Sequence, residues 1–276
     1  MPDRILSLPS PHYLFILKKY LQSQKTAELS YIPKKVRKRA SGKSFSFNEH
    51  LQGLIYALLS SQAVWKKIHD HLPDIDKIFF EYDKEKILIT PPSVFCEKIK
   101  GIKCGNRAIH AQMRSLRTHI HVFERIEAEY GSLDDFVTSE KASHIVTMLS
   151  SPLSPYKLPM VGKALAWEYL RNVGIDAAKP DVHVRRFLGA DRMGNNVGSS
   201  PASLADVEQK MEQLAQETGL LKVEIDDIIW RFCARGYGEI CTASPECERC
   251  VIAALCHTPR HGRDTNIPGI SSSSKR

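Results

Sequence analysis

Residues 158–189 constrain the fold more than any other stretch of this 276-residue chain. The segment LPMVGKALAWEYLRNVG opens with a Pro-x-x-Gly turn, continues as a helix from about Lys163 and stops at Gly174. Proline suits the entry of a helix and glycine its exit. Pro180 and Asp181 then begin a second helix, VHVRRFLG, because aspartate is a preferred N-cap residue. The sequence therefore predicts two helices joined by a short connection.

Helical periodicity extends over most of the remaining chain. Apolar residues recur at helical spacing in 11–24, and they surround the middle of a long segment that begins at Phe47, for which Asn48 is the expected N-cap. Strand-like alternation is confined to 86–90. Further helices are expected at 93–99, 105–129, 132–138, 140–150, 203–218 and 223–235. We expect an all-α protein.

The net charge of +8 has the sign expected of a protein that binds a polyanion. Of these eight excess positive charges, six lie in residues 34–43, which contain no acidic residue. We interpret this run as a solvated linker. A phosphate-contacting arm or a localisation signal is the alternative.

The hydropathy of the chain favours an intracellular protein. The longest apolar run, Leu54–Leu59, is far shorter than the roughly 20 residues of a membrane-spanning helix. The first residues carry charges, at Asp3 and Arg4, and lack the apolar centre of a signal peptide. We expect a monomer in the cytoplasm or nucleoid, or in the nucleus of a eukaryote, that has no membrane association.

Four of the seven cysteines fall within sixteen residues, in the pattern Cys241-x5-Cys247-x2-Cys250-x5-Cys256. Intracellular thiols stay reduced, so this clustering points to a shared metal. Zinc usually takes two separated Cys-x2-Cys pairs or a Cys/His set, and only one such pair exists here. Four thiolates that converge in one loop suit a [4Fe-4S] cluster. We favour the iron–sulfur cluster over zinc, and both over cysteines without a ligand.

Taken together, LPMVGKALA, PDVHVRR and the four-cysteine loop resemble the endonuclease III branch of the helix-hairpin-helix DNA glycosylases. ALLSSQA at 57–63 and IKGIKCGNRAIHAQMRSL at 99–116 extend the similarity, which covers about residues 47–257. The resemblance implies a two-lobed, all-helical fold. An N-terminal helix and basic linker at 1–45 would pack with the C-terminal lobe. A helical barrel domain at 46–176 would end in the hairpin. A C-terminal lobe at 177–260 would carry the iron–sulfur cluster loop, and 261–276 would be a disordered tail.

The resemblance also implies an activity, the hydrolysis of the N-glycosidic bond of a base flipped out of double-stranded DNA. Asp181 would stabilise the cationic sugar and position water, while also capping its helix. Gln62 would fill the gap left by the base, or is a polar residue without a special task. The backbone of the hairpin turn would contact a DNA phosphate. The alternative is that this turn is an ordinary helix entry. Its residues are Pro159, Met160, Val161, Gly162 and the adjoining Lys163.

Two residues depart from the family pattern. Met160 stands where the family usually has glycine. Ala164 stands where strand-cleaving members carry a lysine that forms a Schiff base, and Lys163 lies one position earlier, about 100° around the helix. We therefore predict a monofunctional glycosylase that uses water. A bifunctional enzyme that uses Lys163, or a non-catalytic DNA-binding protein with a structural cluster, is the alternative.

Overall fold

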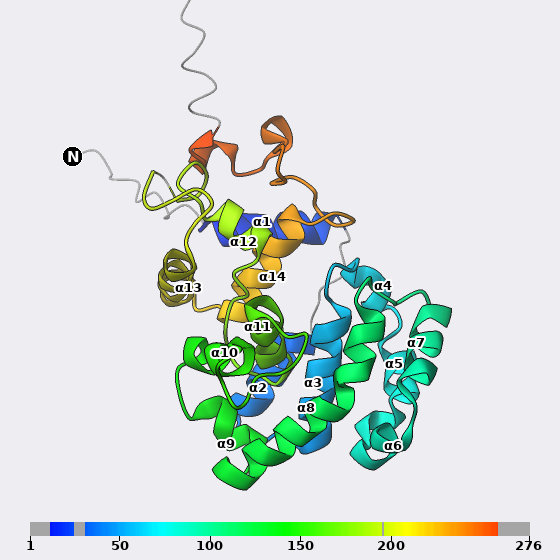
Figure 1. Cartoon of the computed structure of the whole chain (residues 1–276). Helices are drawn as coiled ribbons and strands as arrows, with labels where there is room; N and C mark the ends of the chain where they lie inside the picture. The colour runs from blue at the N-terminus through cyan, green and yellow to red at the C-terminus, as the bar shows by residue number, and fades with distance from the viewer. Residues whose placement is uncertain (1–11, 25–30, 195, 259–276) are drawn as a thin grey trace, which may run out of the picture. The chain divides into compact units, whose positions relative to one another are not determined.

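The computed structural model describes residues 12–24, 31–194 and 196–258, so the predicted disordered tail at 261–276 lies outside the described residues. Within this part of the chain, all regular structure is helical, which confirms the predicted fold class (Figure 1). The chain forms two compact units. The hairpin unit comprises residues 31–179 and 221–224, and the cysteine unit comprises the other described residues.

The hairpin unit is built around a buried helix, α3. Gly53 lets the end of α11 approach α3 closely, because a Cβ atom there would lie 2.9 Å from Val173 Cγ1. Helix α11 packs against both α3 and α10, and α7 packs against the long helix α8. The helices of this unit are α2 (Tyr31–Ala40), α3 (Phe47–Leu59), α4 (Trp65–His69), α5 (Leu72–Ile78), α6 (Lys84–Ile89), α7 (Pro92–Gly101), α8 (Ile109–Tyr130), α9 (Leu133–Thr138), α10 (Ala142–Ser150) and α11 (Lys163–Asn172), with a 3-10 turn at Phe80–Tyr82.

Local capping corrects two predictions. The N-cap of α3 is Ser46 and not Asn48: the Ser46 side chain accepts a hydrogen bond from Glu49 N–H, and the Glu49 carboxylate accepts one from Ser46 N–H, which is a capping box. Residues 86–89 of the strand-like segment belong instead to helix α6, whose C-cap is Thr90, and the Asp83 carboxylate caps this helix by accepting hydrogen bonds from the amides of Glu85 and Lys86. Both helices thus begin at a side chain that satisfies unpaired amide groups.

The basic run is also not the predicted solvated linker. Most of it forms α2, whose Val36 is buried. Arg39 donates hydrogen bonds to the Asp134 carboxylate at 2.7 Å and to the Val173 carbonyl. Residues 31–45 consequently belong to the hairpin unit, rather than to the unit of the first helix. The physical reason is that α2 contributes an apolar face and a partly buried ion pair to the hairpin unit.

The cysteine unit has its own apolar core. Leu14, Leu17 and Leu21 of α1 are fully buried, and Phe232 makes edge contacts with the rings of Tyr20 and Phe187 at 5.9 and 6.3 Å. The loop that carries the four clustered cysteines forms only short 3-10 turns at Cys247–Arg249 and Ala253–Leu255. The helices are α1 (Tyr13–Ser23), α12 (Val182–Phe187), α13 (Leu204–Thr218) and α14 (Lys222–Cys233), of which the first turn of α14 belongs to the hairpin unit.

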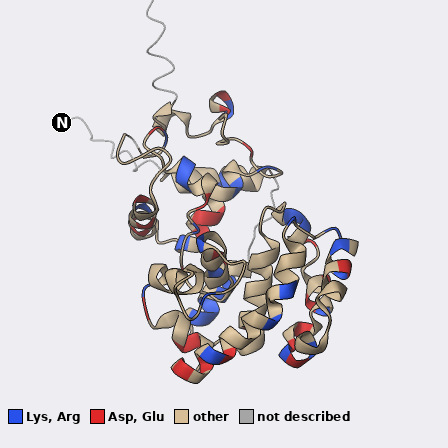
Figure 2. Cartoon of the chain, viewed as in Figure 1, with Lys and Arg blue, Asp and Glu red and all other residues tan. Residues whose placement is uncertain are grey.

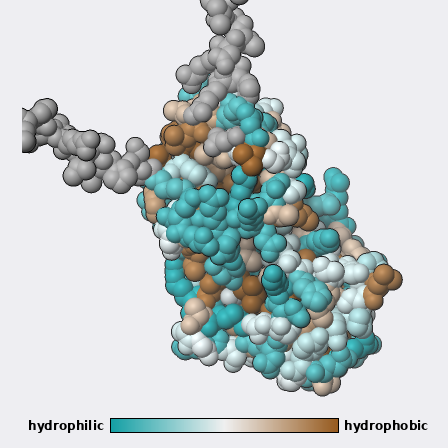
Figure 3. Space-filling model, turned by 90° about the vertical axis from the view of Figure 1, so that its left-hand side faces the viewer, coloured by the Kyte–Doolittle hydropathy of each residue, from teal (hydrophilic) through white to brown (hydrophobic). Residues whose placement is uncertain are grey.

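Charge is unevenly distributed over the hairpin unit. Lysines lie on α4 and α7, and lysines and arginines on α2, whereas Asp and Glu gather on α9 and the end of α8 (Figure 2). The face in Figure 3 is mostly hydrophilic, with hydrophobic residues in separate patches. None of the helices in the described ranges has the length and apolar character to span a membrane. Positive charge thus adjoins the loop between α3 and α4, where Gln62 lies.

Candidate functional site

The predicted hairpin turn joins α10 to α11. Val161 N–H donates a hydrogen bond to the Leu158 carbonyl at 3.1 Å, which closes a four-residue turn. Gly162 is the N-cap of α11 and offers no side chain to cap it, so the first amide groups of this helix have no side-chain acceptor. A Cβ atom on Gly162 would meet nothing within 4 Å. The turn therefore presents backbone N–H groups to open space, as an anion site requires.

Met160 occupies the second central position of this turn. Its φ of 61° is the left-handed conformation that glycine adopts freely, and the residue is 45% exposed. The turn thus keeps a glycine-like backbone although the residue is methionine. The left-handed conformation of a non-glycine residue costs roughly 1 kcal/mol, so Met160 is held there by its surroundings.

Asp181 is the N-cap of α12, as predicted. Its Oδ1 atom accepts hydrogen bonds from His183 N–H at 2.8 Å and Val184 N–H at 3.1 Å. Its Oδ2 atom accepts none from the residues that the structure describes. The side chain is half-buried. One oxygen therefore fixes the carboxylate, and the other is available to a substrate or to water.

Gln62 is exposed and lies in the loop after α3, not within a helix, with a left-handed φ of 54°. Two polar residues hold the base of this loop. Asn106 Nδ2 and Gln112 Nε2 both donate to the Leu58 carbonyl, at 3.0 and 2.9 Å, and Asn106 also donates to Gln112 Oε1. Sequence reasoning missed both residues. The sequence feature that could have pointed to them is a glutamine, Gln112, among the apolar residues of α8.

Lys163 and Ala164 are the first two residues of α11, and both are exposed. Ala164 offers no nucleophile at the position of the family's lysine. Lys163 is the residue before it, at the first position of the helix.

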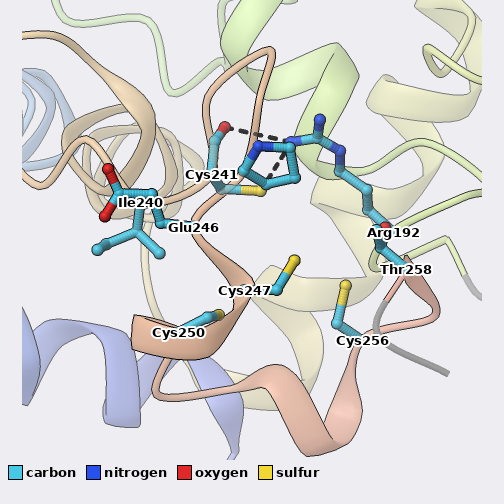
Figure 4. Close-up of a pocket in the computed structure, with 9 residues that line it drawn as sticks. Arg192, Ile240, Cys241, Glu246, Cys247, Cys250, Cys256 and Thr258 are labelled. Atoms are coloured by element: carbon cyan, nitrogen blue, oxygen red, sulfur yellow. Dashed lines mark hydrogen bonds between the residues drawn. The ribbon is translucent and has the colours of Figure 1, made fainter. Parts of the chain in front are cut away.

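The four clustered cysteines line one pocket, together with Arg192 (Figure 4). The Sγ atoms of Cys247 and Cys256 point into the same space. Arg192 is buried and donates from Nη1 to Cys241 Sγ at 3.0 Å, while its Nε has no partner among the described residues. The buried guanidinium therefore uses the sulfur and the carbonyl oxygen of Cys241 as hydrogen-bond acceptors.

A fifth thiol, that of Cys233, lies next to the pocket and contacts Cys241. The sequence pattern had given it no role. A hydrogen bond from Cys233 and the charge of Arg192 lower the pKa of Cys241 to about 7, against the opposing effect of burial. Burial raises the pKa of Cys250 to about 11. A donor set of four thiols beside a buried cation suits a metal held by thiolates. In the described ranges, however, no group of three or more His, Cys, Asp or Glu side chains has the geometry to hold a metal ion.

No protein-family model matches the sequence. A curated relative, an 8-oxoguanine DNA glycosylase/AP lyase from Aquifex aeolicus (strain VF5), is 34% identical over 101 residues, which make up 36% of this chain and 45% of the relative. The chain thus matches less than half the length of this relative. The name of the relative includes a lyase activity, so it does not support the prediction of a monofunctional enzyme.

Solved structures resemble about four fifths of the chain. An 8-oxoguanine glycosylase/lyase from Methanocaldococcus jannaschii, in complex with a 15-mer DNA that contains 8-oxoguanine, has a TM-score of 0.51 and 20% identity, over 79% of this chain and 96% of that one. The 8-oxoguanine DNA glycosylase of Thermotoga maritima has a TM-score of 0.51 and 17% identity, over 81% and 96%. The chain therefore shares the fold of these 8-oxoguanine DNA glycosylases.

Proposed function

We propose that this protein is a DNA glycosylase that removes 8-oxoguanine from double-stranded DNA in base excision repair. The observation that carries the proposal is the carboxylate of Asp181, which is fixed through one oxygen and has the other available. The fold and the names of the similar proteins support this activity and this substrate.

The hairpin turn would bind the DNA backbone. The N–H groups of Met160, Gly162, Lys163 and Ala164 have no acceptor among the described residues, and the positive end of a helix dipole favours an anion. Such a contact positions the duplex but reads no sequence. The exposed Gln62 would fill the space that the flipped base leaves.

Asp181 would act on the sugar. Loss of the base gives the deoxyribose oxocarbenium character, which a nearby negative charge stabilises. The Oδ2 atom is the one that can face this cation or accept a proton from an attacking water. Because Ala164 has no amine, we infer that water is the nucleophile. The lyase activity named for the relative from Aquifex aeolicus makes Lys163 the candidate for a second, strand-cleaving step.

We further propose that Cys241, Cys247, Cys250 and Cys256 bind a [4Fe-4S] cluster, with zinc as the alternative. The buried guanidinium of Arg192 supports thiolate ligation, because it would offset part of their negative charge. When bound, such a group would cross-link a loop that otherwise has only short 3-10 turns. Iron and sulfide analysis with visible absorption spectra of anaerobically purified protein distinguishes the two metals.

The decisive experiment measures base release from duplex oligonucleotides that carry one 8-oxoguanine, with detection of the free base by mass spectrometry. We expect release by the wild type and none by Asp181→Asn. Asparagine caps helices as well as aspartate does, so α12 stays intact and only the charge is lost. Asp191→Asn is a matched control on the same unit. Absence of release from wild type over a broad panel of lesions, with DNA binding retained, would establish the non-catalytic alternative.

Borohydride trapping on the same oligonucleotide tests the nucleophile. Hydrolysis by water predicts no covalent protein–DNA adduct. An adduct that disappears in Lys163→Ala would instead show a bifunctional enzyme, because only a Schiff base between an amine and the sugar is reduced to a stable bond.

A further inference from the structure

Two carbonyl groups of the hairpin turn are each held by a side chain from outside it. His119, in the middle of α8, lies with its Nε2 atom 2.7 Å from the Pro159 carbonyl oxygen, 40 residues away in the sequence. Lys157 donates from Nζ to the Val161 carbonyl. A carbonyl can only accept, so Nε2 of His119 carries the proton. The imidazole is 0% exposed, and its Nδ1 has no partner among the described residues.

These bonds fix the direction of the amide groups. In a planar trans peptide, C=O and N–H point to opposite sides. The Pro159 carbonyl points toward His119, so the N–H of Met160 points away from α8, and the N–H of Gly162 is likewise turned away from Lys157. Neither of these N–H groups has an acceptor in the described part of the chain. Val161 N–H, by contrast, is used inside the turn.

The hydrogen bond from His119 also bears on the choice of turn type. Proline at the first central position fits type I and type II equally, and the two differ by a flip of the central peptide. Type II needs a positive φ at the second central position, which Met160 has at 61°. A methionine there favours type I, since the left-handed conformation is strained. The contact that holds the Pro159 carbonyl opposes this preference.

We propose that His119 is a positioning residue that holds the hairpin turn in its type II form, and thereby aims the Met160 amide at a DNA phosphate. The part that concerns DNA rests on the proposed function. The part that concerns the turn stands on the contacts of the hairpin unit alone. The ligand class is a phosphodiester, because the amides recognise an anion and no base edge is involved.

The affinity for an undamaged duplex tests this role in three variants. His119→Leu fills a similar volume but cannot donate, and we expect its dissociation constant to rise about tenfold, the equivalent of one hydrogen bond to a charged group. His119→Gln carries its amide N–H at the same distance from the backbone as Nε2, and we expect it to stay within about twofold of wild type. His121→Leu changes an exposed histidine on the same helix and serves as the matched control.

A second substitution separates positioning from mere stability. In the double variant His119→Leu with Met160→Gly, glycine accepts the positive φ without strain, so we expect the affinity to return to within about threefold of wild type. Glycine cannot restore packing around residue 119. If the double variant binds as weakly as His119→Leu although both unfold cooperatively, the proposed role is wrong.

Nuclear Overhauser effects report the turn itself without DNA. A type II turn brings Pro159 Hα close to the Met160 amide proton, and a type I turn does not. We expect a strong effect in wild type and a weak one in His119→Leu. A strong effect in both would overturn the proposal. If wild type shows the strong effect but binds no DNA, the proposed function fails and the positioning of the turn stands. If His119→Leu does not fold, His119→Asn, whose amide is one bond too short, takes its place.

Discussion

Asp134 is the residue whose substitution gives the sharpest test of how the hairpin unit is held together. Its Oδ1 atom accepts hydrogen bonds from Arg39 at 2.7 Å and from His50 Nε2 at 3.0 Å, and its Oδ2 atom accepts from Phe45 N–H at 2.9 Å. Burial alone would raise the pKa of Asp134, but these three donors hold it well below its usual range. The carboxylate thus joins α2, α3 and α9.

The substitution Asp134→Asn allows the cost to be worked out. An asparagine that still accepts from Arg39 and His50 must turn its amide nitrogen toward Phe45 N–H, where two donors then meet. A buried N–H without a partner costs about 1–3 kcal/mol, and the exchange of a charged acceptor for a neutral one costs about 1 kcal/mol more. We therefore expect the free energy of unfolding to fall by about 2–4 kcal/mol at pH 7.

Urea denaturation of wild type and variant measures this difference. Asp135→Asn, the same change at the exposed neighbour, should stay within about 0.5 kcal/mol of wild type. Because the folded pKa of Asp134 is depressed, its contribution is complete above the unfolded value of about 4 and is lost as the pH falls below it. The difference in the free energy of unfolding between wild type and Asp134→Asn should therefore become smaller below about pH 4. A difference in the free energy of unfolding below about 1 kcal/mol at pH 7, with an unchanged m-value, would contradict the proposed role of the Asp134 carboxylate.

Three further outcomes follow from the same structure. Met160→Gly should raise the free energy of unfolding by up to about 1 kcal/mol in a thermal or urea titration, because it relieves a left-handed φ at a small cost in chain entropy. Burial lowers the pKa of His119 to about 4, so the neutral imidazole stabilises the fold fully above about pH 6.5. Between pH 6.5 and 4, the free energy of unfolding should fall by up to about 3 kcal/mol. The pH profile of His119→Gln should lack this fall. Removal of a metal from the four cysteines should lower the unfolding temperature and leave the circular dichroism of the helices nearly unchanged at 25 °C.

Features that depend on neighbouring residues could be predicted from the sequence. The turn at Pro159, the helix from Lys163 and the cap at Asp181 each follow a rule that spans four residues or fewer, and all three are present. The capping box at Ser46 was equally available, since Glu49 follows it by three positions, and Asn48 was chosen although this box is the stronger signal.

Features that depend on distant partners could not be predicted. Arg39 belongs to a run that looks solvated because its partner Asp134 lies 95 residues away, and no local pattern connects them. The alternation at 86–90 is too short for its period to distinguish a strand from a helix. The left-handed backbone of Gln62 is also invisible in the sequence, because glutamine gives no sign of a positive φ.

The long helix α8 connects the two loops that sequence reasoning treated separately. Gln112 and His119 are seven residues apart, hence two turns and about 10 Å along one face of this helix. Gln112 donates to the Leu58 carbonyl below the loop of Gln62, and His119 donates to the Pro159 carbonyl in the hairpin turn. One rigid element therefore sets the spacing between the loop that would enter the duplex and the turn that would bind its backbone. A polar residue on the apolar face of a helix is costly unless it makes such a bond, so buried polar positions seven apart are the sequence signal by which this kind of support can be found.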